Sequence, residues 1–298
     1  MSVPAAYIAV ILIWSTTPLA IQWSSEGWGY LSGVTGRMFI GAVLCFALLK
    51  LLRHELPWHK QARMTYLAAG VGVYGAMICT YWGAQFIPSG LIAVLFGLSP
   101  IVTATFATVL LKEQGFTVGK LLGMLLGLTG LLLIFESDIT TKVLAWQGIA
   151  AILLATLIHS GSSVWVKKLA SDMPPLTVTT GALLVAMPAY LLTWSFMHHG
   201  DPVQGTSRAL MAVFYLGVFG SALGFTLFFY ILKRIEANKV ALITLVTPVL
   251  ALLMGQWLNH EKVSLSVWAG AACIILALST HHWADQVVRR LRWATQRA

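Results

Sequence analysis

The sequence predicts an all-α integral membrane protein with ten transmembrane helices, arranged as two inverted five-helix repeats. Three observations predict this fold class: the composition, the spacing of the apolar segments and an internal repeat. Of the 298 residues, 58% are hydrophobic and only 10% are charged, and the mean hydropathy is +0.81. A soluble domain normally carries about 25% charged residues, so this chain could not keep its apolar side chains away from water in one globule. The composition therefore excludes a soluble enzyme, a disordered chain and a disulfide scaffold.

Ten apolar segments are long enough to cross the ~30 Å core of a bilayer as helices. Charges, Gly/Pro turns and polar runs separate them, and a sheet with open edges would leave backbone groups without partners in lipid. The first span follows no basic segment, so we do not expect a cleavable signal peptide. The predicted spans are 4–23, 32–52, 64–85, 89–111, 117–135, 146–166, 176–197, 209–232, 238–258 and 265–283.

The basic residues orient the chain in the membrane. With a cytoplasmic N-terminus, 15 of the 19 Lys and Arg fall on the cytoplasmic side, and Arg37, Lys142, Arg208 and Lys262 fall outside. Cytoplasmic loops are enriched in Lys and Arg, so we expect both termini in the cytoplasm. The net charge of +9 lies in short clusters beside apolar runs, which is typical of membrane flanks and argues against nucleic acid as a partner.

The chain repeats itself at an offset of 148 residues. The stretches 86–116 and 234–264 each contain a hydroxyl-Pro pair near the middle of a span and a Glu thirteen residues after that Pro. The pairs are Ser99-Pro100 with Glu113 and Thr247-Pro248 with Glu261. Five spans in each half force the second half to insert upside down, as in many secondary transporters with a midplane substrate site. We expect the halves to cover 1–143 and 144–284, followed by a basic cytoplasmic tail at 285–298.

Several motifs carry a family resemblance. They are Trp14-Ser15 in the first span, Arg37-Met38-Phe39 opening the second, the stretch from Pro88 through Ser99-Pro100 to Leu111-Lys112-Glu113, and its echo from Thr247-Pro248 to His260-Glu261. Together they resemble the drug/metabolite transporter superfamily, in its EamA-like ten-helix family. The resemblance implies an inner-membrane transporter that often exports amino acids, related metabolites or toxic compounds. It also implies a central cavity surrounded by the first four helices of each half.

His159 is the one ionisable side chain that the sequence places well inside a span. It stands where the first repeat has Trp14, at an offset of 145. Burying such a group in a membrane is costly, so it is a functional candidate. A histidine could protonate near neutral pH and couple transport to a proton gradient, or it could hydrogen-bond the substrate. It could equally be a neutral imidazole that packs against a neighbouring helix, with Ser160, Ser162 or Ser163 as its partner.

Prolines and aromatic residues complete the candidate site. Pro18, Pro100 and Pro248 each interrupt a span and should free the carbonyls of Trp14, Phe96 and Thr244, which suggests a gating role. An aromatic lining would suit an amphipathic solute, although each of these rings could instead face lipid. The predicted substrate-binding residues are Trp14, Ser15, Tyr74, Tyr81, Ser99, His159, Ser163, Phe225, Phe229, Thr244 and Thr247.

The remaining motifs are interpreted as structural. Glu113 and Glu261 should tether helix ends, and the Gly119, Gly123 and Gly127 face permits close helix packing, within a monomer or in a homodimer. No motif predicts a metal site, a cofactor or an ATP-driven motor. We therefore expect a secondary active transporter that exports small metabolites by alternating access. The alternative is a non-transporting membrane sensor, or an enzyme acting on a lipid-soluble substrate.

Overall fold

The computed structural model describes residues 2–111, 145–169, 172–197, 205–241, 243–261, 264–273 and 275–276, with six further residues between 122 and 133. Within these ranges every regular element is a helix. The helices are α1 (Val3–Ser24), α2 (Gly29–Leu51), α3 (Lys60–Val71), η1 (Gly72–Ala76), α4 (Met77–Gly83), α5 (Ser89–Phe96), α6 (Ser99–Leu111), α8 (Ala145–Leu169), α9 (Pro175–Met197), α10 (Ser207–Tyr215), η2 (Leu216–Leu223), α11 (Gly224–Arg234), α12 (Ala237–Ala241) and α13 (Ile243–Asn259).

Among the described residues, seven helical stretches are long and apolar enough to cross a membrane: Val3–Ser24, Gly29–Leu51, Lys60–Gly83, Ser89–Leu111, Ala145–Leu169, Pro175–Met197 and Ser207–Arg234. Each coincides with one predicted span within a few residues. The predicted span 238–258 corresponds to α12 with α13, and residues 265–273 are helical where the tenth span was expected to begin. The span 117–135 lies largely outside the described residues, as do Glu113, the Gly119–Gly123–Gly127 face and the tail at 285–298.

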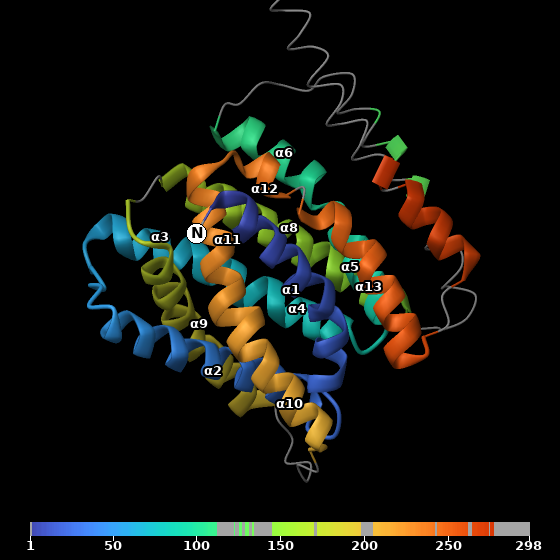
Figure 1. Cartoon of the computed structure of the whole chain (residues 1–298), viewed down its shortest axis with the longest axis horizontal. Helices are drawn as coiled ribbons and strands as arrows, with labels where there is room; N and C mark the ends of the chain where they lie inside the picture. The colour runs from blue at the N-terminus through green and yellow to red at the C-terminus, as the bar shows by residue number, and fades with distance from the viewer. Residues whose placement is uncertain are drawn as a thin grey trace, which may run out of the picture.

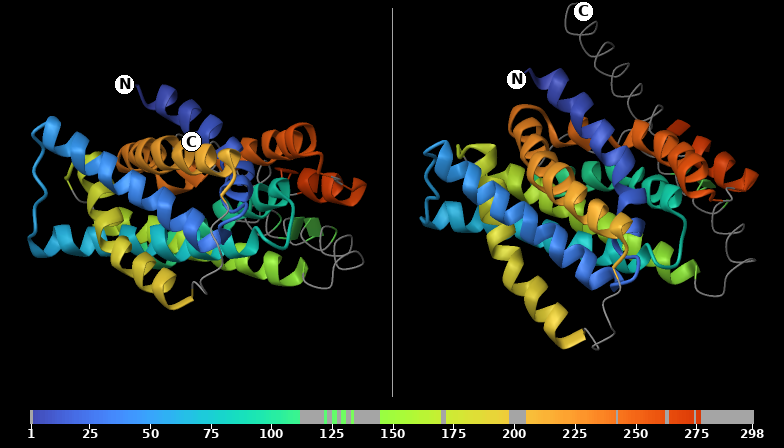
Figure 2. Two further views of the ribbon diagram at one scale, coloured as in Figure 1. Left: turned by 90° about the horizontal axis from the view of Figure 1, so that it is seen from below. Right: turned by 60° about the horizontal axis from the view of Figure 1, so that its bottom comes forward.

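The helices pack side by side in a layered bundle (Figures 1 and 2). α1, α4, α8 and α11 occupy its centre in Figure 1, with α2, α3 and α9 on one side and α5 and α13 on the other. The outward surface is apolar as well: Phe39, Phe196, Phe214 and Trp257 are all more than half exposed. A soluble protein rarely shows such a surface, whereas a bilayer solvates it.

Two of the spans contain π-helical segments near their middle. η1 lies between α3 and α4, and η2 lies between α10 and α11, which are corresponding positions under the offset of 148. A π-segment leaves the regular hydrogen-bond ladder and often marks a functional region of a helix. In the second segment small residues face α2: a side chain added at Gly217 would collide with Ile40, and one added at Gly41 would collide with Ser221. These glycines let the two backbones approach closely.

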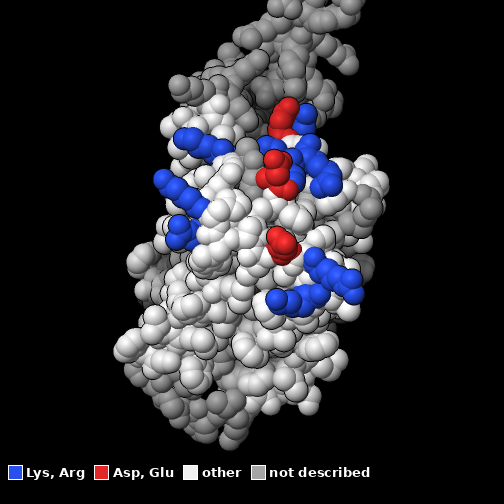
Figure 3. Space-filling model, turned by 90° about the vertical axis from the view of Figure 1, so that its left-hand side faces the viewer, with Lys and Arg blue, Asp and Glu red and all other residues white. Residues whose placement is uncertain are grey.

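Nine of the eleven described Lys and Arg residues gather at one end of the bundle. Lys50, Arg53, Lys60, Arg63, Lys167, Lys168, Lys233, Arg234 and Lys239 lie in the last or first turns of helices that meet there, or in the loop between α2 and α3. Hydrogen bonds from Gln61 to the Leu169 carbonyl and from Lys233 to the Asp172 carbonyl join these segments. Figure 3 views this end and shows Lys and Arg side chains spread around it, with acidic side chains between them. We call it the basic end.

At the opposite end, Glu261 fastens α5 to the segment after α13. The Ser89 hydroxyl donates to Glu261 Oε1 at 2.6 Å, the Gly90 N–H donates to Oε2 at 3.4 Å, and the Asn259 amide donates to Oε1 at 3.0 Å. A carboxylate beside a helix N-terminus satisfies free N–H groups and complements the helix dipole. The prediction that Glu261 tethers a helix end is therefore confirmed.

Candidate functional site

The bundle contains a central cavity of about 80 Å³. A single water needs roughly 10–15 Å³ of such space, so the cavity has room for several waters or a small organic solute. Its wall is largely apolar, with a few hydroxyl groups, one imidazole and one guanidinium. The lining residues are Trp14, Thr17, Pro18, Ile21, Arg37, Met77, Thr80, Ile92, Ala93, Phe96, His159, Phe225, Thr244 and Thr247.

Aromatic rings from four helices meet at one side of the central cavity. The Trp14 ring lies 5.8 Å from the His159 ring and 5.2 Å from the Phe228 ring. The His159 ring lies 5.2 Å from Phe228 and 6.3 Å from Phe96, measured between centroids. We call Trp14, Phe96, His159 and Phe228 the aromatic cluster. Contacts at these distances and tilts are favourable ring pairs, so the cluster holds α1, α5, α8 and α11 together.

Further pockets continue from the aromatic cluster toward the basic end. Two small ones, of about 10 Å³ each, share His159 with the central cavity and are also lined by Phe228. One of them shares Phe229 with a larger pocket of about 240 Å³ at the basic end, which is lined in part by Lys167 and Lys233. The rings of His159 and Phe228 therefore stand between the central cavity and the basic end.

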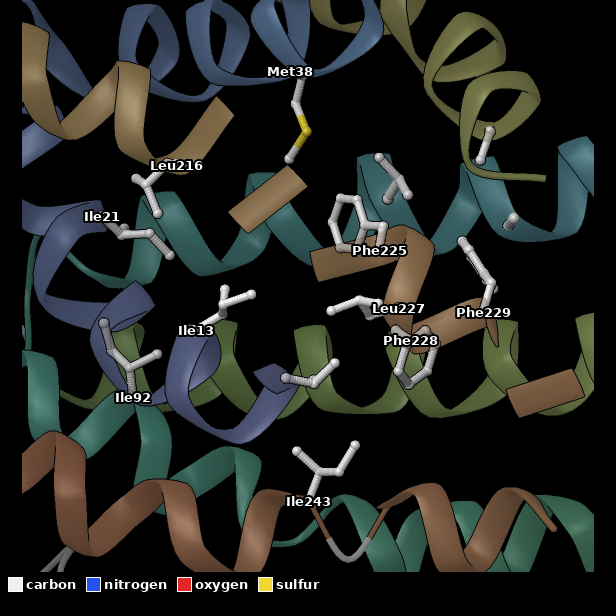
Figure 4. Close-up of a cluster of buried hydrophobic side chains, with 14 of the residues drawn as sticks. Ile13, Ile21, Met38, Ile92, Leu216, Phe225, Leu227, Phe228, Phe229 and Ile243 are labelled. Atoms are coloured by element: carbon white, nitrogen blue, oxygen red, sulfur yellow. The ribbon is translucent and has the colours of Figure 1, made fainter. Parts of the chain in front are cut away.

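Figure 4 shows the phenylalanines of α11, of which Phe228 belongs to the aromatic cluster. Phe225, Phe228 and Phe229 all project from α11, and Phe228 and Phe229 occupy adjacent positions of the helix. Phe225 and Phe229 are four residues apart and so lie on one face of the helix, as the spacing predicts. All three phenylalanines are nearly buried, which excludes the alternative in which Phe225 and Phe229 face lipid.

Several predicted polar residues use their hydroxyl hydrogen on nearby backbone. Ser99 donates to the Phe96 carbonyl at 2.6 Å, Ser163 donates to the His159 carbonyl at 2.7 Å, and Thr244 donates to the Ala241 carbonyl at 2.7 Å. Each hydroxyl oxygen is then left as an acceptor. The carbonyl of Phe96, which Pro100 was expected to free, is thus satisfied by Ser99.

The three prolines occupy different positions within their helices. Pro18 lines the central cavity from inside α1, and Pro248 lies inside α13. Pro100 lies in the first turn of α6, where the fourth span breaks after α5. A proline is tolerated there because the N–H groups of a first turn have no helical partner.

Three of the predicted site residues, Ser15, Tyr74 and Tyr81, line none of these pockets. Ser15 donates to the Ile11 carbonyl of its own helix. Tyr74 pairs its hydroxyl with Thr193 at 2.6 Å and packs its ring on Tyr190, so it faces α9. The Tyr81 hydroxyl accepts from Ser24 at 3.2 Å, which links α4 to the last turn of α1. The contacts of Tyr74 and Tyr81 join helices, whereas that of Ser15 stays within α1.

Sequence reasoning missed several residues of the central cavity: Thr17, Ile21, Arg37, Met77, Thr80, Ile92, Ala93 and Phe96. It also missed Phe228, which completes the aromatic cluster. A signal was available for Thr17, which lies one turn after Trp14 on the same helix face. The others depend on how helices from distant parts of the sequence pack.

Arg37 requires a correction. It was expected among the charges outside the membrane, and His159 was expected to be the one ionisable group well inside a span. In the structure Arg37 is the ninth residue of α2 and only 2% exposed. The apolar run that contains it begins before it, at Tyr30 and Leu31, so the helix carries the guanidinium into the bundle.

These features define a helical, multi-pass membrane protein with a small-molecule cavity between its spans. Among the residues that the structure describes, no three His, Cys, Asp or Glu side chains come together that could hold a metal. The family model described as "EamA-like transporter family" matches residues 3–136 and again 146–280. The chain belongs to the EamA-like transporter family, within the drug/metabolite transporter superfamily, and the predicted family membership is confirmed.

Similar proteins agree with this assignment. An uncharacterized transporter of Bacillus subtilis (strain 168), YoaV, is 30% identical over 90% of this chain and 92% of its own length. The uncharacterized inner membrane transporter YedA of Escherichia coli (strain K12) is 26% identical over 92% of this chain and 88% of its own. A probable terminal-alkyne amino-acid exporter of Streptantibioticus cattleyicolor is 24% identical, covering 89% of each chain. A solved protein structure with 20% identity superposes with a TM-score of 0.70 over 97% of this chain and 98% of its own, which shows the shared fold.

Proposed function

We propose that this transporter is a secondary active exporter of small amphipathic metabolites, of which amino acids are one class, and that it works by alternating access. The observation that carries the proposal is the central cavity, whose wall comes from both of the stretches that match the family model. Trp14, Arg37 and Phe96 belong to the first stretch, and His159, Phe225 and Thr247 belong to the second. A site between two repeats can be exposed to either side as one repeat moves against the other.

The two stretches are proposed to be inverted five-helix repeats, over 1–143 and 144–284, in the inner membrane with both termini in the cytoplasm. Nine of the eleven described Lys and Arg residues lie at the basic end, which supports a cytoplasmic location for that end. The central cavity then lies nearer the outer side, and the pockets beyond His159 lead to the cytoplasm.

In this proposal the aromatic cluster is the cytoplasmic gate. Phe96 lies on the span that holds Pro100, and Phe228 lies on α11. A small rotation of either would separate these rings from His159, with Pro100 and Pro248 as the proposed gating points. Apolar and aromatic surfaces part at little polar cost, because their ring contacts are individually weak. His159 is the proposed proton-coupling group, since it lines both the central cavity and the pockets on the other side of the cluster.

The test is flux of a pool of neutral and aromatic amino acids in proteoliposomes, with and without an imposed pH gradient. His159→Ala is compared with His54→Ala. His54 is exposed in the loop at the basic end, so its substitution removes an imidazole without changing the cavity. We expect saturable flux that follows the gradient in wild type and in His54→Ala, and that loses this dependence in His159→Ala.

Two results would contradict parts of the proposal. Flux that ignores the gradient in wild type would make the protein a facilitator and remove proton coupling. Cysteines at positions 99 and 247 that show the same accessibility with and without substrate would contradict alternating access about these spans.

A further inference from the structure

Arg37 places a permanent positive charge inside the membrane-spanning part of the protein. As the ninth residue of α2, it lies about 12 Å along the helix axis from Gly29 at 1.5 Å per residue. Its side chain is 2% exposed and lines the central cavity. A guanidinium keeps its charge under all physiological conditions, so it cannot escape the cost of burial by losing a proton.

Only some of the hydrogen-bond donors of this guanidinium have partners in the protein. Arg37 Nε donates to Ser221 Oγ at 2.9 Å, and within the described residues the buried Nη1 has no hydrogen-bond partner. The hydrogen bond to Ser221 fixes the guanidinium at its Nε atom. Gly220 leaves room for the guanidinium, since an added Cβ at this position would lie 3.0 Å from Arg37 Nη2. The guanidinium is therefore held in place through Nε, while Nη1 has no partner among the described residues.

No described carboxylate balances the charge. Glu26 pairs with Arg208, and Glu236 pairs with Lys239. Glu261 is held by Ser89, Gly90 and Asn259 at the N-terminus of α5. The other two described acids, Glu55 and Asp172, follow α2 and precede α9 at the basic end. Buried charges are normally paired, so an unpaired one in a cavity marks a place for a ligand of opposite charge.

We propose that Arg37 is the carboxylate-binding residue of the transport site and that the substrate is a small monocarboxylate with an apolar or aromatic body. The planar fork of arginine matches the two oxygens of a carboxylate. The remaining wall, with Trp14, Phe96 and Phe225, fits an apolar body. Among the lining residues Arg37 carries the one permanent positive charge, which disfavours dicarboxylates. This inference rests on the proposed transport function and specifies its substrate class.

The test uses three probes that share one ring: phenylalanine, 3-phenylpropionate and phenethylamine. The first two carry the carboxylate and the third lacks it, so they separate recognition of the acid from recognition of the ring. Flux of each is measured in proteoliposomes of the full-length protein, in chloride and in chloride-free sulfate buffer. Binding of each probe is measured separately, as the shift in melting temperature of the purified protein.

The variants are chosen so that folding and charge are separated. Arg37→Met removes the charge at similar length, Arg37→Lys keeps the charge without the fork, and Ser221→Ala keeps the guanidinium without its helix tie. Arg208→Met is the matched control, since Arg208 is an exposed arginine that pairs with Glu26.

We expect wild type and Arg208→Met to prefer both carboxylates over phenethylamine by at least tenfold in flux. Arg37→Met should lose this preference while it still carries phenethylamine, which would show that it is folded. Arg37→Lys should keep part of the preference, and Ser221→Ala should weaken it less than Arg37→Met does.

The opposing results are distinct. Equal flux of all three probes in wild type and Arg37→Met would overturn the role of Arg37 and leave transport standing. Equal defects in Ser221→Ala and Arg37→Met for every probe, amine included, would reduce Arg37 to a link between α2 and η2. Flux that needs chloride, regardless of the carboxylate, would make chloride the occupant. If wild type transports none of the probes, the transport proposal fails; the inference then survives only if both carboxylates raise the melting temperature and Arg37→Met abolishes that shift.

Discussion

Removing the carboxylate of Glu261 should destabilise the contact between the two family-matched stretches. In Glu261→Ala the buried Ser89 hydroxyl, the Gly90 N–H and the Asn259 amide lose their common acceptor. A buried donor without a partner costs about 1–3 kcal/mol. The Gly90 contact is long, so we count only the other two donors, whose costs sum to about 2–6 kcal/mol. Because Glu261 is partly exposed, we take the lower part of that range, about 2–3 kcal/mol.

The assay is thermal unfolding of the purified protein in detergent. One kcal/mol shifts the melting temperature of a chain of this size class by about 2–4 °C, so Glu261→Ala should melt roughly 4–12 °C below wild type. Glu261→Gln keeps an acceptor oxygen and should lose about half as much. The control is Glu236→Ala, because the pair between Glu236 and Lys239 is exposed and such pairs contribute little.

A double-mutant cycle sharpens this prediction. Ser89→Ala removes the donor of the shortest contact, so its effect should be largely absent when Glu261 is already alanine. Two results would contradict the tether between α5 and the end of α13. One is that the losses of stability from the two substitutions are additive; the other is that Glu261→Ala has the same melting temperature as the Glu236→Ala control.

Three further predictions concern the site and its supports. Gly220→Ala should push against Arg37 Nη2 and lower the preference for carboxylates over phenethylamine several-fold, with unchanged amine flux; an unchanged preference would mean that the fork has room to move. Phe228→Ala should open the path past the aromatic cluster and raise passive leak of the probe at zero gradient, and a leak equal to wild type would show that other rings suffice. Lys167→Met should remove donors to the carbonyls of Leu232 and Ile235, at 2.7 and 2.9 Å, and lower stability by about 1–3 kcal/mol, whereas Lys168→Met should melt like wild type because Lys168 is exposed; equal melting of both variants would contradict the capping role.

Much of the helical framework could be predicted because lipid leaves a chain few choices. A segment of about twenty apolar residues must satisfy its own backbone groups, and a helix is the local way to do so. For this reason the spans that became α1, α2, α8 and α9 were placed within a few residues. The repeat also carried spatial information: Trp14 and His159, paired by an offset of 145, have their rings in contact.

Which side of each helix faces inward could not be read from the sequence. In a membrane both the core and the lipid-facing surface are apolar, so hydrophobicity does not distinguish them. Phe219 and Phe225 are alike in the sequence, yet the first is 43% exposed and the second 6%. Tyr74 and Tyr81 were assigned to the cavity by the same kind of pattern, and packing turned them toward other helices.

Arg37 shows the same division most clearly. The sequence by itself determined that this arginine lies beside or within an apolar run, and that the chain would build a bundle of membrane-spanning helices. Only the tertiary structure decided that the side chain points inward, because its position depends on Ser221 and Gly220, more than 180 residues away. Local patterns specify helices, since the hydrogen bonds of a helix are local. The central cavity is made of contacts between distant segments, and those exist only once the helices have packed.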